Sequence, residues 1–280
     1  MRLKIQFETK GKKQILPLNY QYPISAWIYK VLSKADKEFT EMLHDEGYVL
    51  ENGKKFKLFT FSKLSFPKHT WRIIPNSDRM EVWARKAWLT VSFQLPEQIE
   101  KFVTGLFKDQ KVFIGDKISG IEIQVVNVEN LGQELFTGQD LQELQDYDDV
   151  GIKFKTISPI VIGYFEDGKK NEQYINPMNS GYKAIFINNL IDKYKATGDN
   201  NIDINKINFE VTKLYTKTEL QTIKAFTPAE TKVRGYHYEF SLTAPKKIIE
   251  VGYNSGFGSM NSVGFGFCEV ELDMIYRINR

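Results

Sequence analysis

The stretch GYNSGFGSMNSVGFGF spans residues 252–267 and concentrates five of the chain's 19 glycines. These five are Gly252, Gly256, Gly258, Gly264 and Gly266. An ordinary turn needs one or two glycines, so five indicate a loop whose backbone comes so close to another group that a Cβ would collide with it. The exposed N–H groups of such loops bind anions, above all phosphate. The alternative is a glycine-rich hairpin that only packs two layers of the fold together.

The glycine spacing does not match the common nucleotide-binding motifs. No GK[ST] follows the stretch, so it is not the phosphate-binding loop of nucleotide hydrolases. Gly256 and Gly258 are not followed by the third glycine of a dinucleotide fingerprint, because Asn261 stands in its place. Composition and spacing alone leave phosphate binding and simple packing both open.

Length and composition predict a globular protein of two ordinary domains or one large one, since the chain has 280 residues and is 42% hydrophobic. Its one cysteine, Cys268, excludes an internal disulfide, and no Cys/His cluster has zinc spacing, so we expect neither metal nor cofactor. The charged, alternating N-terminus does not resemble a signal peptide, and no apolar run could span a membrane. We therefore expect a cytoplasmic protein that does not bind membranes.

The net charge of +3 is unevenly distributed along the chain. Residues 129–149 contain seven acidic residues and no Lys or Arg, so the remainder of the chain carries +10. Residues 51–88 alone hold nine basic and three acidic residues, with several aromatic side chains among them. A basic surface with many aromatic residues suits a nucleic-acid partner, whereas ordinary solvated lysine would explain the charge equally well.

The first half alternates between strand and helix patterns. Leu3, Ile5 and Phe7 alternate with polar residues, which predicts a strand. Ser25 is the expected N-cap of a helix whose apolar spacing continues as far as Leu43.

Further alternation predicts strands over 57–66, 71–74, 80–93 and 112–128, with a helix beginning near Pro96. The resulting order is the split βαβ, ferredoxin-like pattern.

The second half repeats this order after the acidic segment, which we interpret as the connection between domains. Strands are expected over 152–162, 209–215, 233–242 and 263–272, and helices over 180–194 and 246–252. The sequence thus predicts an α+β protein of two tandem ferredoxin-like domains, over residues 1–130 and 150–280, with the glycine-rich loop near the end of the second.

Three motifs, in order along the chain, resemble a known family. They are LHDEGY at 43–48, KLFTFS at 57–62 and GFGSMNSVGFGF at 256–267. Together with tandem ferredoxin-like domains, they are similar to the CRISPR-associated repeat-processing endoribonucleases, the sixth of the numbered Cas proteins, in the RAMP superfamily. The resemblance covers essentially the whole chain.

The resemblance implies a metal-independent endoribonuclease that cuts CRISPR precursor RNA within the repeat and so produces guide RNAs. The ribose 2′-hydroxyl attacks the adjacent phosphate and leaves a 2′,3′-cyclic phosphate and a 5′-hydroxyl. The implied partners are repeat RNA and other Cas proteins of a surveillance complex, with the chain a monomer or a homodimer. A non-catalytic RNA-binding RAMP subunit of such a complex is the alternative.

The family's frequent catalytic set carries over onto Tyr29, His44 and Lys57. His44 stands just before Gly47, where a helix C-terminus would favour the imidazolium that a general acid needs. Tyr29 has the role of orienting the 2′-hydroxyl, because a phenol with a pKa of about 10 is a poor base. On an unbroken helix Tyr29 and His44 would be about 22 Å apart, so the shared role requires a break, for which residues 33–36 offer capping side chains.

Phosphate contacts are expected from basic side chains and from the glycine loop. Lys57 would hold the charged phosphate. The other candidates for RNA contact are Lys54, Lys55, Arg72, Lys232, Arg234, Gly252, Gly256, Gly258, Gly264 and Gly266. Each of the basic residues could equally be a solvated surface charge, and Tyr29 and His44 could be an ordinary helix aromatic and a helix-end cap.

Overall fold

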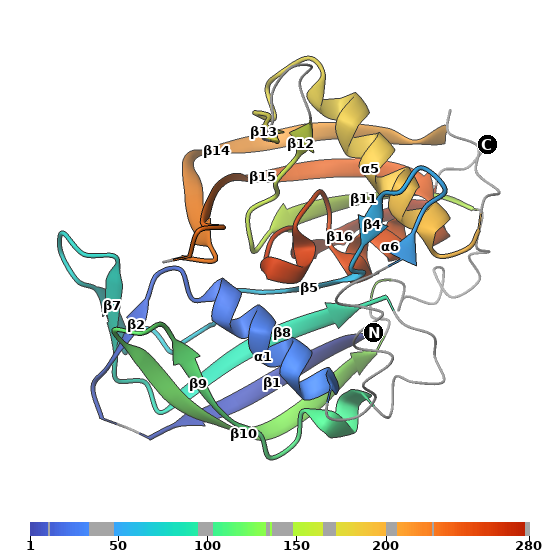
Figure 1. Cartoon of the computed structure of the whole chain (residues 1–280). Helices are drawn as coiled ribbons and strands as arrows, with labels where there is room; N and C mark the ends of the chain where they lie inside the picture. The colour runs from blue at the N-terminus through green and yellow to red at the C-terminus, as the bar shows by residue number, and fades with distance from the viewer. Residues whose placement is uncertain are drawn as a thin grey trace.

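The structure of the chain is a computed structural model. The structure describes residues 1–10, 12–33, 48–94, 103–132, 135, 148–164, 172–199, 206–225 and 227–277. Residues 271–277 are described by their backbone alone. The fold is mixed α/β, with strands predominating. Two sheets, one from each half of the chain, lie one above the other, with α6 and the glycine loop (residues 252–267) between them (Figure 1).

The N-terminal sheet is built from residues that alternate between buried and exposed positions. Its strands are β1 (Arg2–Thr9), β5 (Phe59–Phe61), β8 (Lys86–Phe93), β9 (Lys111–Gly115) and β10 (Gly120–Gly132), in the spatial order β5-β8-β1-β10-β9. Every neighbouring pair is antiparallel. Leu3, Ile5 and Phe7 of the central strand are buried, as their alternation predicts.

Helix α1 (Gln21–Ser33) packs on this sheet through Ile24, Ile28 and Val31, which recur at helical spacing and are buried. The helix begins four residues before Ser25, so the prediction that Ser25 is its N-cap is wrong. Ser25 instead lies on the first turns of the helix and donates a hydrogen bond from its hydroxyl to the Ser262 carbonyl oxygen, 2.6 Å away.

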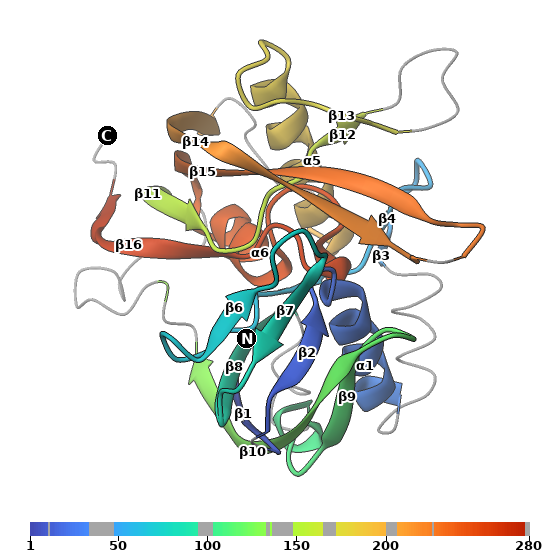
Figure 2. The ribbon, with the colours of Figure 1, turned by 90° about the vertical axis from the view of Figure 1, so that its left-hand side faces the viewer.

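A small sheet not expected from the sequence flanks the N-terminal half (Figure 2). Its strands are β2 (Gln14–Pro17), β7 (Arg79–Val82) and β6 (Trp71–Ile73), in the order β2-β7-β6. Four-residue strands are too short for a clear alternation, which explains why β2 was missed. A two-stranded pair, β3 (Tyr48–Val49) and β4 (Lys55–Phe56), precedes β5.

The C-terminal sheet has the order β14-β15-β11-β16. Its strands are β11 (Asp149–Thr156), β14 (Asn208–Ile223), β15 (Thr231–Pro245) and β16 (Cys268–Arg277). Helices α5 (Tyr182–Ala196) and α6 (Lys246–Ser255) pack with it around Phe154, Phe186 and Phe240. A two-stranded pair, β12 (Gly163–Tyr164) and β13 (Gln173–Tyr174), lies beyond β11.

The two halves have separate hydrophobic cores but are joined by buried polar contacts. The Arg2 guanidinium donates hydrogen bonds to the carbonyl oxygens of Tyr253 (2.8 Å) and Cys268 (2.9 Å), and its Cζ lies 3.3 Å from the centroid of the Tyr253 ring. Asn254 donates to the Gln94 side-chain oxygen at 3.1 Å. These contacts fix α6 and the glycine loop against the N-terminal sheet.

Candidate functional site

The glycine loop is held from within by a buried lysine. The ammonium of Lys193, on α5, donates to the carbonyl oxygens of Gly256 and Gly258 at 2.5 Å and to the side-chain oxygen of Asn261 at 2.6 Å. Three acceptors use all three of its protons. Burial lowers the pKa of Lys193 to about 7, and the side chain is only 2% exposed.

Asn261 completes the internal bonding of the loop. Its amide nitrogen donates to the carbonyl oxygens of Phe257 and Phe265, both at 3.0 Å. The Lys193–Asn261 pair thus connects both arms of the loop and turns four carbonyl groups inward. Sequence reasoning missed Lys193, although its spacing of three from Leu190 and seven from Phe186 places all three on the buried side of α5.

The glycines are required because the loop is packed closely by the protein itself. A Cβ on Gly264 would lie 2.8 Å from the Phe61 ring, and one on Gly258 would lie 2.4 Å from the Val161 carbonyl oxygen. Both glycines also have positive φ, at +93° and +74°. All five predicted glycines are buried, and among them Gly258 lines the pocket described below. Close packing therefore accounts for the glycine content, and RNA contact by these glycines stays a prediction.

The loop docks directly on the N-terminal half. The Thr60 hydroxyl of β5 donates to the Phe265 carbonyl oxygen at 2.8 Å, beside the contact between Ser25 and Ser262. In the segment from Ser259 to Val263, which includes the short 3₁₀ helix η4 (Asn261–Val263), every residue but the buried Asn261 is partly exposed. This segment faces Tyr29 and Lys57, two of the residues predicted to be catalytic.

Tyr29 and Lys57, 28 positions apart in the chain, lie together at this place. The Lys57 ammonium nitrogen is 5.5 Å from the centroid of the Tyr29 ring, and the Tyr29 phenol lies near the Ser262 side chain. Burial raises the pKa of Tyr29 well above its usual value, although the nearby Ser262 side chain opposes the shift. A neutral phenol can donate a hydrogen bond but cannot act as a base near neutral pH. His44 lies outside the described residues, and the described part of α1 ends at Ser33.

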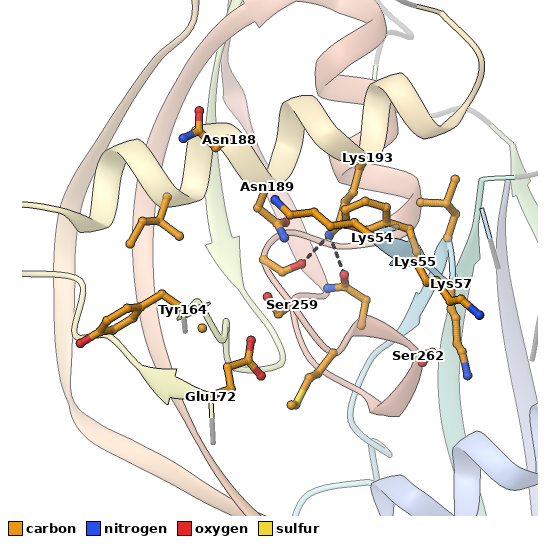
Figure 3. A pocket seen from close by; sticks show the side chains of 17 residues that line it. Lys54, Lys55, Lys57, Tyr164, Glu172, Asn188, Asn189, Lys193, Ser259 and Ser262 are labelled. Atoms are coloured by element: carbon orange, nitrogen blue, oxygen red, sulfur yellow. Dashed lines mark hydrogen bonds between the residues drawn. The ribbon is translucent and has the colours of Figure 1, made fainter. Parts of the chain in front are cut away.

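A pocket of about 580 Å³ opens between the two halves next to Lys57 and the exposed part of the loop (Figure 3). Three lysines, Lys54, Lys55 and Lys57, line one end, and Ser259 and Ser262 line its floor. The Lys54 ammonium also pairs with Asp192 on α5 at 2.5 Å. The lysine-lined end suits a phosphate group, because the positive charges of three lysines in and beside β4 are concentrated near α5.

Other predicted RNA contacts lie away from this pocket. Arg72, on β6, pairs with Glu81 on β7 at 2.6 Å. Lys232 lines a second groove of about 410 Å³ between the β14–β15 hairpin and the N-terminal half, together with Asn19 and Lys117. Arg234 is exposed two positions further along β15. The structure therefore brings together Lys54, Lys55, Lys57, Tyr29 and Gly258, and does not bring Arg72, Lys232 or Arg234 to the same place.

The described part of the chain has neither a cluster of metal ligands nor a membrane-spanning helix. Among the residues that the structure describes, no group of three or more His, Cys, Asp or Glu side chains could hold a metal ion. No helix within the described ranges is long and apolar enough to cross a membrane.

Comparisons with known proteins match both halves of the chain. The family model for the N-terminal part of the CRISPR-associated protein Cas6 matches residues 15–128, and the model for the Cas6 C-terminal part matches residues 142–270. The CRISPR-associated endoribonuclease Cas6 1 of Methanocaldococcus jannaschii is 30% identical over 278 residues, which are 95% of this chain and 91% of that protein.

Two further relatives come from Pyrococcus furiosus. Its CRISPR-associated endoribonuclease Cas6 is 28% identical over 266 residues, covering 94% of this chain and 87% of that protein. The solved structure of the product of a Cas6-related gene superposes with a TM-score of 0.73 at 22% identity, covering 96% of this chain and 98% of that one, and shows that the fold is shared. The sequence resemblance is thereby confirmed: this chain belongs to the Cas6 family of CRISPR-associated proteins.

Proposed function

We propose that this protein is an endoribonuclease that cuts CRISPR precursor RNA within the repeat and releases guide RNAs. The observation that carries the proposal is the meeting of Tyr29 and Lys57 beside Ser262 of the glycine loop, at the edge of a lysine-lined pocket. The names of the relatives in M. jannaschii and P. furiosus support the same activity.

The proposed chemistry asks for alignment and charge stabilisation. The ribose 2′-hydroxyl is the nucleophile, so the protein must place it in line with the phosphate, handle two protons and stabilise the developing charge. The neutral Tyr29 phenol orients the 2′-hydroxyl, and Lys57 stabilises the charge on the phosphate. His44 donates a proton to the departing 5′-oxygen. The products are a 2′,3′-cyclic phosphate and a 5′-hydroxyl, and none of these steps requires a metal.

We also propose that each half is a ferredoxin-like domain, the first over residues 1–130 and the second over 150–280. The strand orders support this assignment. Without the additional edge strand β9, the N-terminal order is β5-β8-β1-β10, and the C-terminal order is β14-β15-β11-β16. Numbered within each half, both read as second, third, first and fourth strand, which is the arrangement that two split βαβ units produce. The glycine loop would then lie where the two domains meet.

The proposal is tested by incubating the purified protein with end-labelled repeat RNA in the presence of EDTA. We expect cleavage at one position, with a product whose 3′ end resists polynucleotide tailing until the cyclic phosphate is removed. A protein that binds the RNA tightly without cutting it would instead be a non-catalytic RNA-binding subunit. Cleavage that stops when the metal is chelated would refute the proposed chemistry.

A further inference from the structure

The pocket beside the glycine loop has two chemically different ends. The end lined by Lys54, Lys55 and Lys57 is cationic. The opposite end, which we call the acceptor end, is lined by Gly163, Tyr164, Glu172, Asn188 and Asn189; the described cations that reach its edge are Lys54, which pairs with Asp192 on α5, and the buried Lys193, whose protons are already engaged. The acceptor end lies between α5 and the β12–β13 pair (Figure 3).

Glu172 is fitted closely into the wall of the acceptor end. The carboxyl group lies against Gly163, where an added Cβ would be 2.1 Å from its Oε1 and would displace it. Partial burial raises the pKa of Glu172. Within the described ranges no Lys, Arg or His forms an ion pair with it. Such a group favours a ligand that donates hydrogen bonds and repels a phosphate.

Asn189 provides a second acceptor. Its side-chain oxygen is shielded from solvent and has no hydrogen-bond partner among the described residues. A buried acceptor without a donor costs about 1–3 kcal/mol, and turning the Asn189 amide toward the pocket would let a bound donor recover it. Tyr164, Ile185 and Met260 add apolar surface to the same pocket, against which the planar ring of a base can stack.

We propose that the acceptor end binds one unpaired guanine of the RNA, with its phosphate toward the lysines, and that Glu172 and Asn189 determine this specificity. This inference rests on the proposed RNA function. A nucleotide has a charged phosphate at one end and a neutral, hydrogen-bonding base at the other, which matches the two ends of the pocket. Guanine presents N1–H and the N2 amino group side by side, so a carboxylate accepts from both.

The other bases fit this set of acceptors less well. Cytosine and adenine each place a ring-nitrogen acceptor beside their amino group, and the lone pair of that nitrogen would face the Glu172 carboxylate without a proton between them. Uracil places carbonyl oxygens on both sides of its single ring N–H. A discriminating pair of hydrogen bonds to a base contributes about 1–3 kcal/mol, which corresponds to a preference of roughly five- to 150-fold.

The test selects binders from a random-sequence RNA pool with the wild-type protein, Glu172→Gln and the matched control Glu210→Gln, which removes the same charge from an exposed position on β14. We expect wild type and Glu210→Gln to enrich guanine at one position of the selected motif, and Glu172→Gln to lose that preference while keeping the rest of the motif. Replacing this guanine by inosine, which lacks the 2-amino group and so loses one of the two hydrogen bonds, should then weaken wild-type binding by roughly two- to 12-fold and leave Glu172→Gln nearly unaffected.

Two outcomes would overturn the inference. In one, Glu172→Gln selects the same motif and has the same inosine penalty as wild type. In the other, the wild-type protein enriches no base at all. A wild-type protein that shows the guanine preference but does not cut repeat RNA would uphold the inference and refute the proposed cleavage, so the two claims fail separately. A thermal melt of each variant confirms that the protein used is folded.

Discussion

Replacing Lys193 with Met removes the ammonium that holds the glycine loop while keeping an unbranched side chain of similar length. Met can fill the space of the lysine stem, so little packing is lost. What is lost are three hydrogen bonds, to the carbonyl oxygens of Gly256 and Gly258 and to the Asn261 side chain. The loop's internal bonding should fail at the point where both arms are joined.

The size of the effect follows from the buried acceptors. Each one left without a donor costs about 1–3 kcal/mol, so three would cost roughly 3–9 kcal/mol. Burial lowers the pKa of Lys193 to about 7, because desolvating an ammonium costs free energy. The Met variant avoids this desolvation cost, which offsets part of the loss. We therefore expect a net loss of about 3 kcal/mol, near the lower limit. For a chain of this length that corresponds to a fall in Tm of roughly 6 °C.

The assay is thermal unfolding of Lys193→Met beside Lys195→Met, which changes a partly exposed lysine on the same helix. Amide hydrogen exchange of residues 256–266 should accelerate in the first variant only, because these amides depend on the loop's internal bonds. A Lys193→Met protein that melts within about 1 °C of wild type, with unchanged exchange in the loop, would refute the reasoning.

Three further predictions concern packing, acid stability and RNA affinity. Gly264→Ala should destabilise the fold by about 1–3 kcal/mol more than Gly53→Ala in a denaturant titration. Both glycines have positive φ, but only at Gly264 would a Cβ meet a ring, that of Phe61. Equal losses of stability in the two variants would contradict this. Burial raises the pKa of Glu219, but hydrogen bonds from His237, Lys63 and Gln221 lower it to about 2 from its usual 4.5, so its stabilisation is complete above pH 4.5 and is lost as the pH falls toward 2. Glu219→Gln should therefore remove about 3 kcal/mol of the stability difference between these pH values, and a stability–pH curve parallel to that of wild type would exclude this role. Lys55→Ala should reduce the slope of log affinity against log salt by about 0.7 for single-stranded RNA, and an unchanged slope would exclude Lys55 from the phosphate contacts. The slope of Arg72→Ala, measured beside it, decides whether β6 belongs to the same RNA surface.

Much of the element order could be predicted because it depends on local patterns. The alternation in β1 and the helical spacing of α5 and α6 are set by which side chains must be buried, and each segment carries that pattern alone. The start of α1 was placed four residues late because Ser25, a residue type that favours N-caps, forms a tertiary hydrogen bond instead.

The candidate site could be predicted only in part, because its geometry depends on long-range contacts. The resemblance of motifs indicated Tyr29 and Lys57, and the structure places them together. The structure also shows that Gly264 and Gly258 are required because Phe61 and Val161 leave no room for a Cβ. No local sequence pattern connects these two residues to the loop. Lys193 was missed because most lysines are solvated, and only its partners in the folded chain explain a buried one.

The most direct test of the proposed function is single-turnover cleavage of repeat RNA in EDTA by wild type, Tyr29→Phe, Lys57→Ala and His44→Ala. We predict that wild type cuts at one position. His44→Ala should remain folded and bind RNA nearly as wild type does, but cut about 10²–10⁴-fold more slowly, the usual contribution of a positioned acid or base. Tyr29→Phe should slow cleavage without loss of packing, and Lys57→Ala should slow it and also weaken binding. Folded variants that all cut at the wild-type rate would contradict the assignment of these three residues to catalysis.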